Sequence, residues 1–144
     1  MRICLLNALI MPFDTDGAEI AAFIAQKIDL ARYESILKEA KASGMELESY
    51  LGHQSTADFL KDLVSEELKE HFVMNRVNLN LEEGDLALVF RVTNRGPMMK
   101  EHSLEDLKAF HEKGETEFVL LSRVAMPEIV LNPSLYFQQV GGEK

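Results

Sequence analysis

The feature that most limits the possible folds is a period-two apolar pattern in the middle of the chain. Apolar residues alternate with asparagines over residues 77–81, a Glu-Glu-Gly sequence follows, and the alternation resumes over residues 86–92. Such alternation places the apolar side chains on one face of a strand, and a short glycine-containing turn joins two strands into a hairpin. The pattern therefore predicts a β-hairpin.

Three other segments have the apolar spacing of an amphipathic helix. The first follows Asp29, a good N-cap residue, and stops at Gly44. The second and third begin at Ser55 and Ser103 with the sequence Ser-x-x-Asp, which has the form of a capping box. The third stops at Gly114, a usual residue after a helix end. We expect three helices.

Short apolar runs supply the remaining strands. Residues 3–9 precede a Met-Pro breaker and predict a buried first strand, and residues 117–124 predict the last one. Residues 18–28 are ambiguous, because their alanines favour a helix whereas their length also suits a strand, which we favour. The order predicts an α/β fold in which helices flank a compact mixed sheet.

The composition fits one domain. A chain of 144 residues with 47% hydrophobic residues can bury a substantial core. We assign residues 1–124 to this domain and residues 125–144 to a C-terminal extension, which we expect to dock through its apolar residues and to fray at its end. The apolar run near the N-terminus is too short for the apolar region of a signal peptide, and no apolar stretch approaches the roughly 18 residues of a membrane span. We therefore expect a cytoplasmic protein.

The charge and the rare residue types exclude several classes of site. The chain has 15 Lys and Arg against 24 Asp and Glu, a net charge of -9, which argues against nonspecific binding to DNA or to an anionic membrane. An anionic ligand must therefore meet a local positive site. The single Cys4 excludes an internal disulfide and a multi-cysteine zinc site. His71, His102 and His111 lack metal-ligand spacing, so we expect no metal and no cofactor.

The sequence Gly52-His53-Gln54-Ser55-Thr56 is the main candidate for a phosphate-binding and catalytic site. A helix start presents unpaired N–H groups and a partial positive charge, so the amides of residues 55–58 and the hydroxyls of Ser55 and Thr56 are suited to a phosphate. A histidine beside that phosphate can protonate a leaving oxygen. The alternative is an ordinary loop histidine before a capped helix, and the residues alone leave both interpretations open.

Two arginines and one asparagine are the next candidates. Arg76 lies at the start of the predicted hairpin and Arg95 beyond its end, and arginine binds phosphate through two parallel hydrogen bonds. Asn7 lies toward the end of the first predicted strand, where its amide is suited to a base or a ribose. Solvated charges and a polar strand end are the alternatives.

These residues belong to an ordered series of short motifs. The series reads Leu6-Asn7-Ala8, Tyr50-Leu51-Gly52-His53-Gln54-Ser55-Thr56, Asn75-Arg76-Val77, Glu83-Gly84-Asp85, Arg95 and Ser103-Leu104-Glu105-Asp106-Leu107. Over about residues 3–124, it resembles the viral and bacterial family that includes the type III anti-CRISPR ring nucleases. The signature of that family is Gly-His-x-Ser-Thr followed by Asn-Arg-Val and Gly-Asp.

The resemblance implies an α/β domain that forms a two-fold homodimer over cyclic tetra-adenylate, the messenger that activates CRISPR ancillary nucleases. In that family the reaction needs no metal. A ribose 2′-hydroxyl attacks the adjacent phosphorus, the 5′-oxygen leaves, and linear di-adenylates with a 2′,3′-cyclic phosphate result. Such an enzyme switches off type III CRISPR signalling, in the host cytoplasm if a virus or phage encodes it.

The resemblance also implies roles for single residues. His53 corresponds to the general acid that protonates the 5′-oxygen. The residues that correspond to substrate-binding positions are Asn7, Gln54, Ser55, Thr56, Arg76 and Arg95.

Two positions depart from the family pattern and leave the rate and the preferred ring size open. A glutamate that assists at the site is replaced by Met98, with Glu101 as the nearest acidic residue, and a serine after the first strand is replaced by Ile10. A protein that sequesters a cyclic oligonucleotide without cutting it is therefore an alternative. A structural or regulatory partner of a phage or mobile element is another, suggested by the acidic composition and the apolar extension.

Overall fold

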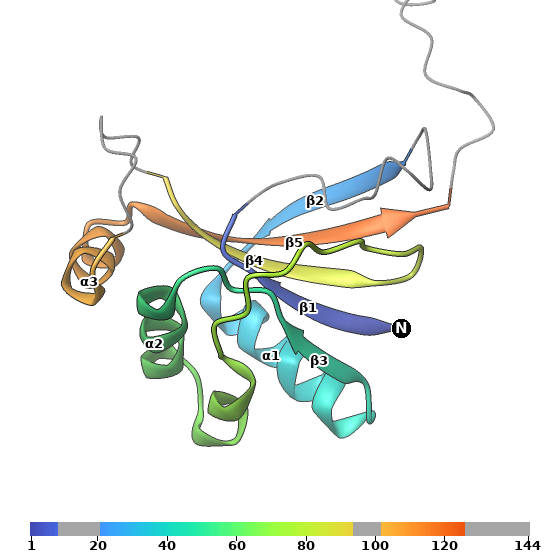
Figure 1. Cartoon of the computed structure of the whole chain (residues 1–144), viewed down its shortest axis with the longest axis horizontal. Helices are drawn as coiled ribbons and strands as arrows, with labels where there is room; N and C mark the ends of the chain where they lie inside the picture. Colours follow the sequence, from blue (N-terminus) through green and yellow to red (C-terminus); the bar gives the residue numbers. More distant parts are fainter. Residues whose placement is uncertain (9–20, 94–101, 126–144) are drawn as a thin grey trace, which may run out of the picture.

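The computed structural model describes residues 1–8, 21–93 and 102–125, which form a five-stranded mixed sheet flanked by helices (Figure 1). The elements are β1 (Arg2–Leu6), β2 (Ala22–Ile28), α1 (Leu30–Ala42), β3 (Glu46–Ser49), α2 (Gln54–Leu63), the 3-10 helix η1 (Glu66–His71), β4 (Leu86–Val92), α3 (Leu104–Glu112) and β5 (Thr116–Val124). The predicted fold class is confirmed.

The strand order, β2-β5-β4-β1-β3, places three parallel strands side by side. β1 pairs in parallel with β3 and with β4, whereas β5 is antiparallel to β4 and β2. Parallel strands end at the same edge of a sheet, which is where α/β proteins usually bind ligands. The segments that carry Asn7 and His53 follow β1 and β3, so both residues lie beyond this edge.

Alternation along the strands divides the core into two clusters. On one face, Ile3, Leu88 and Phe118 pack against apolar residues of the three α-helices, which lie on the same side of the sheet (Figure 1). On the other face, Cys4 and Val89 belong to a second cluster that Leu79 and Leu81 help to cover. Burial raises the pKa of the Cys4 thiol to about 12, so this thiol stays neutral and behaves as a small apolar group.

The predicted hairpin is wrong. Residues 77–81 form no strand, because β4 already pairs with β1 on one edge and with β5 on the other. Their alternation serves packing instead: Val77 is exposed, Leu79 is half-buried and Leu81 is fully buried against the second cluster. The predicted turn is present, and Gly84 adopts a φ of 90° that favours glycine.

The ends of α1 and α3 are confirmed. The Asp29 carboxylate accepts a hydrogen bond from the Arg32 amide at the start of α1. At α3, Ser103 and Asp106 form the predicted capping box, in which each side chain accepts from the other residue's amide. Both caps satisfy helix donors that would otherwise lack a partner.

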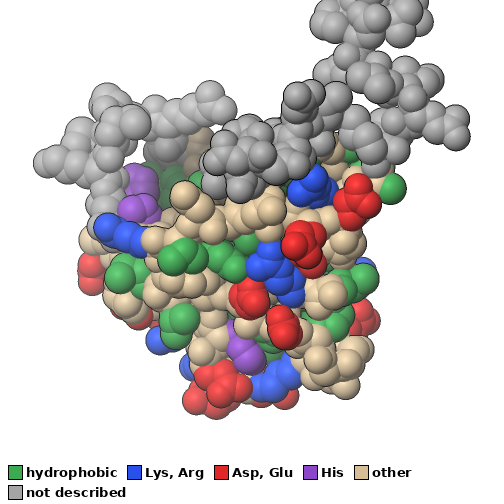
Figure 2. Space-filling view, turned by 45° about the vertical axis from the view of Figure 1, so that its right-hand side comes forward, with side chains coloured by type: hydrophobic (Ala, Val, Ile, Leu, Met, Phe, Trp, Pro, Cys, Tyr) green, Lys and Arg blue, Asp and Glu red, His purple; other side chains and the backbone are tan. Residues whose placement is uncertain are grey.

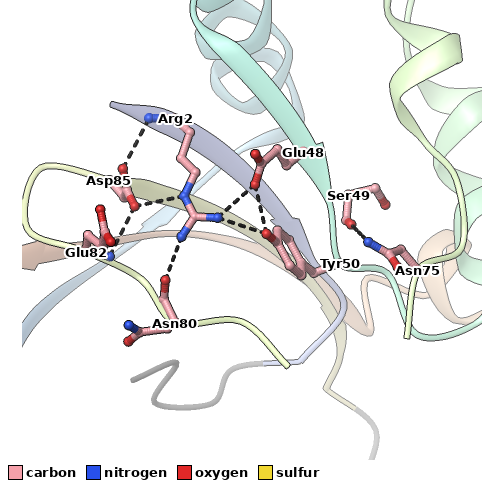
Figure 3. A network of polar contacts seen from close by, with 8 residues as sticks. All are labelled: Arg2, Glu48, Ser49, Tyr50, Asn75, Asn80, Glu82 and Asp85. Carbon is pink, nitrogen blue, oxygen red and sulfur yellow. Dashed lines mark hydrogen bonds and ion pairs between the residues drawn. The ribbon is translucent and has the colours of Figure 1, made fainter. Parts of the chain in front are cut away.

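A polar network joins β1 and β3 to the segment that crosses the second cluster (Figure 3). The Arg2 guanidinium donates to carboxylate oxygens of Asp85 and Glu48, at 3.0 and 2.8 Å, and to the carbonyl of Asn80 at 2.6 Å. The Tyr50 hydroxyl, 2.8 Å from both Arg2 and Glu48, completes the network. One arginine of β1 thus connects β3 with the segment that leads into β4.

The remaining strand predictions hold with shifted ends. β2 confirms the strand interpretation over the helical one, β1 ends earlier than predicted, and β5 agrees closely. Residues 126–144, which contain most of the predicted extension, lie outside the part of the chain that the structure describes.

The described part of the chain has a surface of mixed charge, and its helices are not suited to spanning a membrane. On the face drawn in Figure 2, acidic and basic side chains lie next to one another over the described part rather than in separate areas. Among the helices that the structure describes, none is long and apolar enough to span a bilayer.

Candidate functional site

The candidate site begins where β1 and β3 end. Beyond β3, the Tyr50 amide donates to the Leu5 carbonyl at 2.8 Å and so extends the pairing of the two strands. Two residues later, the Gly52 amide donates to Oδ1 of Asn7 at 3.2 Å. The structure therefore brings Asn7 into direct contact with the turn that leads to His53.

His53 is the N-cap residue of α2, one position closer to the helix than predicted. Its backbone is extended, with φ -135° and ψ 135°, and its carbonyl accepts from the Ala57 amide at 3.2 Å. Its side chain forms no capping hydrogen bond, is half-buried, and has its Nδ1 atom buried. The imidazole thus lies at the start of the helix without capping a backbone amide of the first turn.

The capping box predicted at Ser55 is wrong. Ser55 lies inside the first turn, and its hydroxyl donates to the His102 carbonyl at 2.7 Å, a partner just before α3. The predicted box carboxylate, Asp58, instead accepts from the Gln54 side chain at 2.9 Å. The Ser55 hydroxyl thus forms a tertiary contact, and the Asp58 carboxylate forms an i,i+4 contact, so neither caps the helix. The bond from Ser55 also links the start of α2 to the start of α3.

The first turn of α2 differs electrostatically from that of α3. It contains no acidic residue, whereas the first turn of α3 contains Glu105 and Asp106. Carboxylates at a helix start neutralise the positive end of the helix dipole. Of the two hydroxyl residues in the α2 turn, Ser55 is half-buried and Thr56 is buried. The start of α2 is therefore the better place for an anion.

Arg76 contacts the same turn. Its Nε atom donates to the Gly52 carbonyl at 2.6 Å, and the residue is exposed. The two polar groups of Gly52 are therefore both held by side chains, the amide by Asn7 and the carbonyl by Arg76. Arg76 reaches this place from an irregular segment and not from a hairpin strand.

Asn75 is a residue of the site whose role its sequence position alone does not predict. Its backbone amide donates to the Leu51 carbonyl at 2.8 Å, and its side-chain amide donates to the Ser49 carbonyl at 2.9 Å (Figure 3). The signal in the sequence was its position directly before Arg76 in the Asn-Arg-Val motif, but a motif does not show what an asparagine contacts.

The other predicted residues divide into two groups. Gln54, Ser55 and Thr56 lie in the helical turn that follows His53, as their spacing requires. Arg95 lies outside the described residues, as do Ile10, Met98 and Glu101, where the chain departs from the pattern of the ring nucleases.

Comparisons with known proteins place this chain. A family model described as STIV B116-like matches residues 3–116, which include every residue of the candidate site. The chain belongs to the STIV B116-like family. A solved structure of a similar protein is B116 of Sulfolobus turreted icosahedral virus, with 21% sequence identity and a TM-score of 0.59. The match covers 85% of this chain and 99% of B116, and at that identity it shows a shared fold alone. No curated protein matches the sequence.

Proposed function

We propose that this protein is a metal-independent ring nuclease that cleaves cyclic tetra-adenylate and so switches off type III CRISPR signalling. The proposal combines the resemblance of the motif series to the anti-CRISPR ring nucleases with membership of a family named after a viral protein. One observation carries it furthest: His53 directly precedes α2 and follows Gly52, which is held by Asn7 and Arg76, both of which are proposed to bind the ring.

The geometry supports an anion at the start of α2. The turn has no acidic residue and no side-chain cap, and Arg76 lies beside it. A phosphate at this place gains the helix dipole and the charge of an arginine. Arg95 would add a second phosphate contact, and the side chains of Gln54, Ser55 and Thr56 lie within the same turn.

In the proposed reaction, the 2′-oxygen of one ribose attacks the adjacent phosphorus and forms the 2′,3′-cyclic phosphate. The bond from phosphorus to the 5′-oxygen breaks, and His53 transfers a proton to that oxygen. The proton of the 2′-hydroxyl passes to solvent. Holding the 2′-oxygen in line supplies much of the rate, since orientation is worth roughly 7 to 11 kcal/mol in favourable systems. A strong general base is then unnecessary.

A two-fold homodimer suits this reaction, because the ring has the same symmetry. Each protomer would then supply one active site for one of two opposite phosphodiesters. Two cuts give two linear di-adenylates.

The test is an incubation of the purified protein with cyclic tetra-adenylate in excess EDTA. We expect linear di-adenylates with a 2′,3′-cyclic phosphate, and a loss of about 10²-fold or more in rate for His53→Gln. His71→Gln is the matched control, because His71 lies in η1, which follows the far end of α2, and it should keep the parent rate. An intact ring after prolonged incubation with excess enzyme would rule out the proposal.

The same assay decides the alternative of sequestration. A protein that binds the ring without cutting it would show tight binding by calorimetry and no products, with His53→Gln also binding. Turnover that depends on His53 eliminates this alternative.

A further inference from the structure

A segment of four residues runs beside the chain that leads from β3 to His53. The Asn75 amide donates to the Leu51 carbonyl at 2.8 Å, and Leu51 forms a parallel bridge with Met74. The Ser49 hydroxyl donates to the Val73 carbonyl. Residues 73–76, the flanking segment, therefore lie along the end of β3 like a short additional strand.

Asn75 forms two of the bonds that hold this flanking segment. Besides its backbone bond, its Nδ2 atom donates to the Ser49 carbonyl at 2.9 Å, and Figure 3 shows the side-chain amide pointing at Ser49. A carboxylate of the same shape has no proton to donate there. The position requires an amide because the partner is a carbonyl oxygen.

Two groups of the proposed site depend on this segment. Arg76 directly follows Asn75, and its Nε atom reaches the Gly52 carbonyl. On the other side, the Leu51 carbonyl that Asn75 binds lies two residues before His53. One asparagine thus fixes both the arginine and the start of the turn that presents the imidazole.

We propose that Asn75 is a positioning residue, which sets the relative placement of His53 and Arg76. The inference rests on the proposed function for its kinetic consequence and deepens it. A misplacement of a reacting group by about 1 Å can cost an enzyme about 10²-fold in rate, so a loosened segment should act mainly on kcat.

The kinetic test compares Asn75→Asp with Asn78→Asp. Both changes add one negative charge to the irregular chain between η1 and β4. Asn78 is exposed, lies three positions further on and is outside the flanking segment. We expect Asn75→Asp to lower kcat about tenfold or more with a small change in KM, and Asn78→Asp to stay within about twofold of the parent. Equal kcat values for the two variants, both folded by circular dichroism, would overturn the proposal.

A second measurement separates this inference from the proposed function, because it needs no substrate. The ring resonances of His53 in NMR spectra should shift in Asn75→Asp and in the neutral Asn75→Ala, and not in Asn78→Asp. Unchanged His53 resonances in both Asn75 variants would overturn the positioning role. If the parent protein cuts no ring, the proposed function fails, and the comparison of His53 resonances alone decides whether Asn75 is a positioning residue.

Ser49→Ala keeps the inference testable if the Asn75 variants do not fold. This change removes another of the side-chain bonds that hold the flanking segment, the one to the Val73 carbonyl, and leaves a small buried residue. We expect a smaller loss of kcat in the same direction and a shift of the same His53 resonances. Parent values for both would contradict the proposal.

Discussion

At the scale of the residue, Gly52 is held by its hydrogen bonds and not by a special backbone conformation. Its φ is not among the positive values found at Gly44, Gly84 and Gly114. A Cβ atom at this position would lie 3.6 Å from Oδ1 of Asn7, an ordinary van der Waals distance. The described fold therefore does not require glycine here, which leaves the close approach of a ligand as a reason for it.

Gly52→Ala should separate stability from binding. We expect a free energy of unfolding equal to that of the parent or higher by up to about 1 kcal/mol, because alanine restricts the unfolded chain. Binding of cyclic tetra-adenylate should weaken. Denaturant unfolding and calorimetry measure the two effects, and a variant that unfolds much more easily would show that the fold itself needs glycine.

At the scale of the element, α2 is the helix whose first turn belongs to the candidate site, and it is also the helix whose start was predicted wrongly. α1 and α3 follow their local caps, Asp29 and Ser103, because those side chains act on amides three residues away. At α2, the predicted cap residue Ser55 binds the carbonyl of His102, which is 47 positions away. Single-sequence patterns describe local capping and contain no information on such a partner.

Long-range pairing explains the other error. The period-two pattern of residues 77–81 is real, but whether it makes a strand depends on a free edge of β4, and β1 and β5 occupy both edges. Arg2 also holds the Asn80 carbonyl from the start of the chain. The candidate residues Asn7, His53 and Arg76 were found from motif and position, whereas the contacts of Asn75 became visible only in the structure.

The uncapped start of α2 gives a prediction for a charge change. In Gln54→Glu, the new carboxylate gains about 0.3 to 1 kcal/mol from the helix dipole. It also lies one turn from Asp58, a repulsion of about 0.2 to 0.5 kcal/mol, and it loses the bond to that residue. The stability should therefore change little, while the affinity for cyclic tetra-adenylate should fall about tenfold from repulsion of the phosphate.

Gln26→Glu is the matched control for this change, since Gln26 is exposed on the edge strand β2 and gains the same charge. Unfolding experiments and calorimetry compare the two variants. An equal loss of affinity in both would show that net charge, and not the start of α2, controls ring binding.

At the scale of the whole molecule, the Arg2 network couples stability to pH. Hydrogen bonds from Arg2 and then Tyr50 lower the pKa of Glu48. A carboxyl group with a lowered folded pKa stabilises the protein above its unfolded pKa, and this contribution is lost as the pH falls through the folded value. The network should therefore weaken in acid and stay intact at neutral pH.

Glu48→Gln should remove part of this acid dependence. Because the Glu48 side chain is 36% exposed, solvent screening limits the expected loss of stability at neutral pH to about 1 kcal/mol or less. As the pH falls from the ordinary glutamate pKa of about 4.3 through the lowered pKa of folded Glu48, the variant and the parent should converge. Urea unfolding at several pH values measures this, with Glu46→Gln, an exposed change on the same strand, as control. Curves that stay parallel at all pH values would contradict the role of Glu48.

The central claim is that His53 protonates the leaving 5′-oxygen, and a substrate with sulfur in place of that oxygen tests it most directly. A thiolate leaves without a proton, so the general acid becomes unnecessary. We predict that His53→Ala cleaves cyclic tetra-adenylate at least about 10²-fold more slowly than the parent but cleaves the 5′-thio ring at nearly the parent rate. If His53→Ala is equally impaired on both rings, His53 is not the general acid.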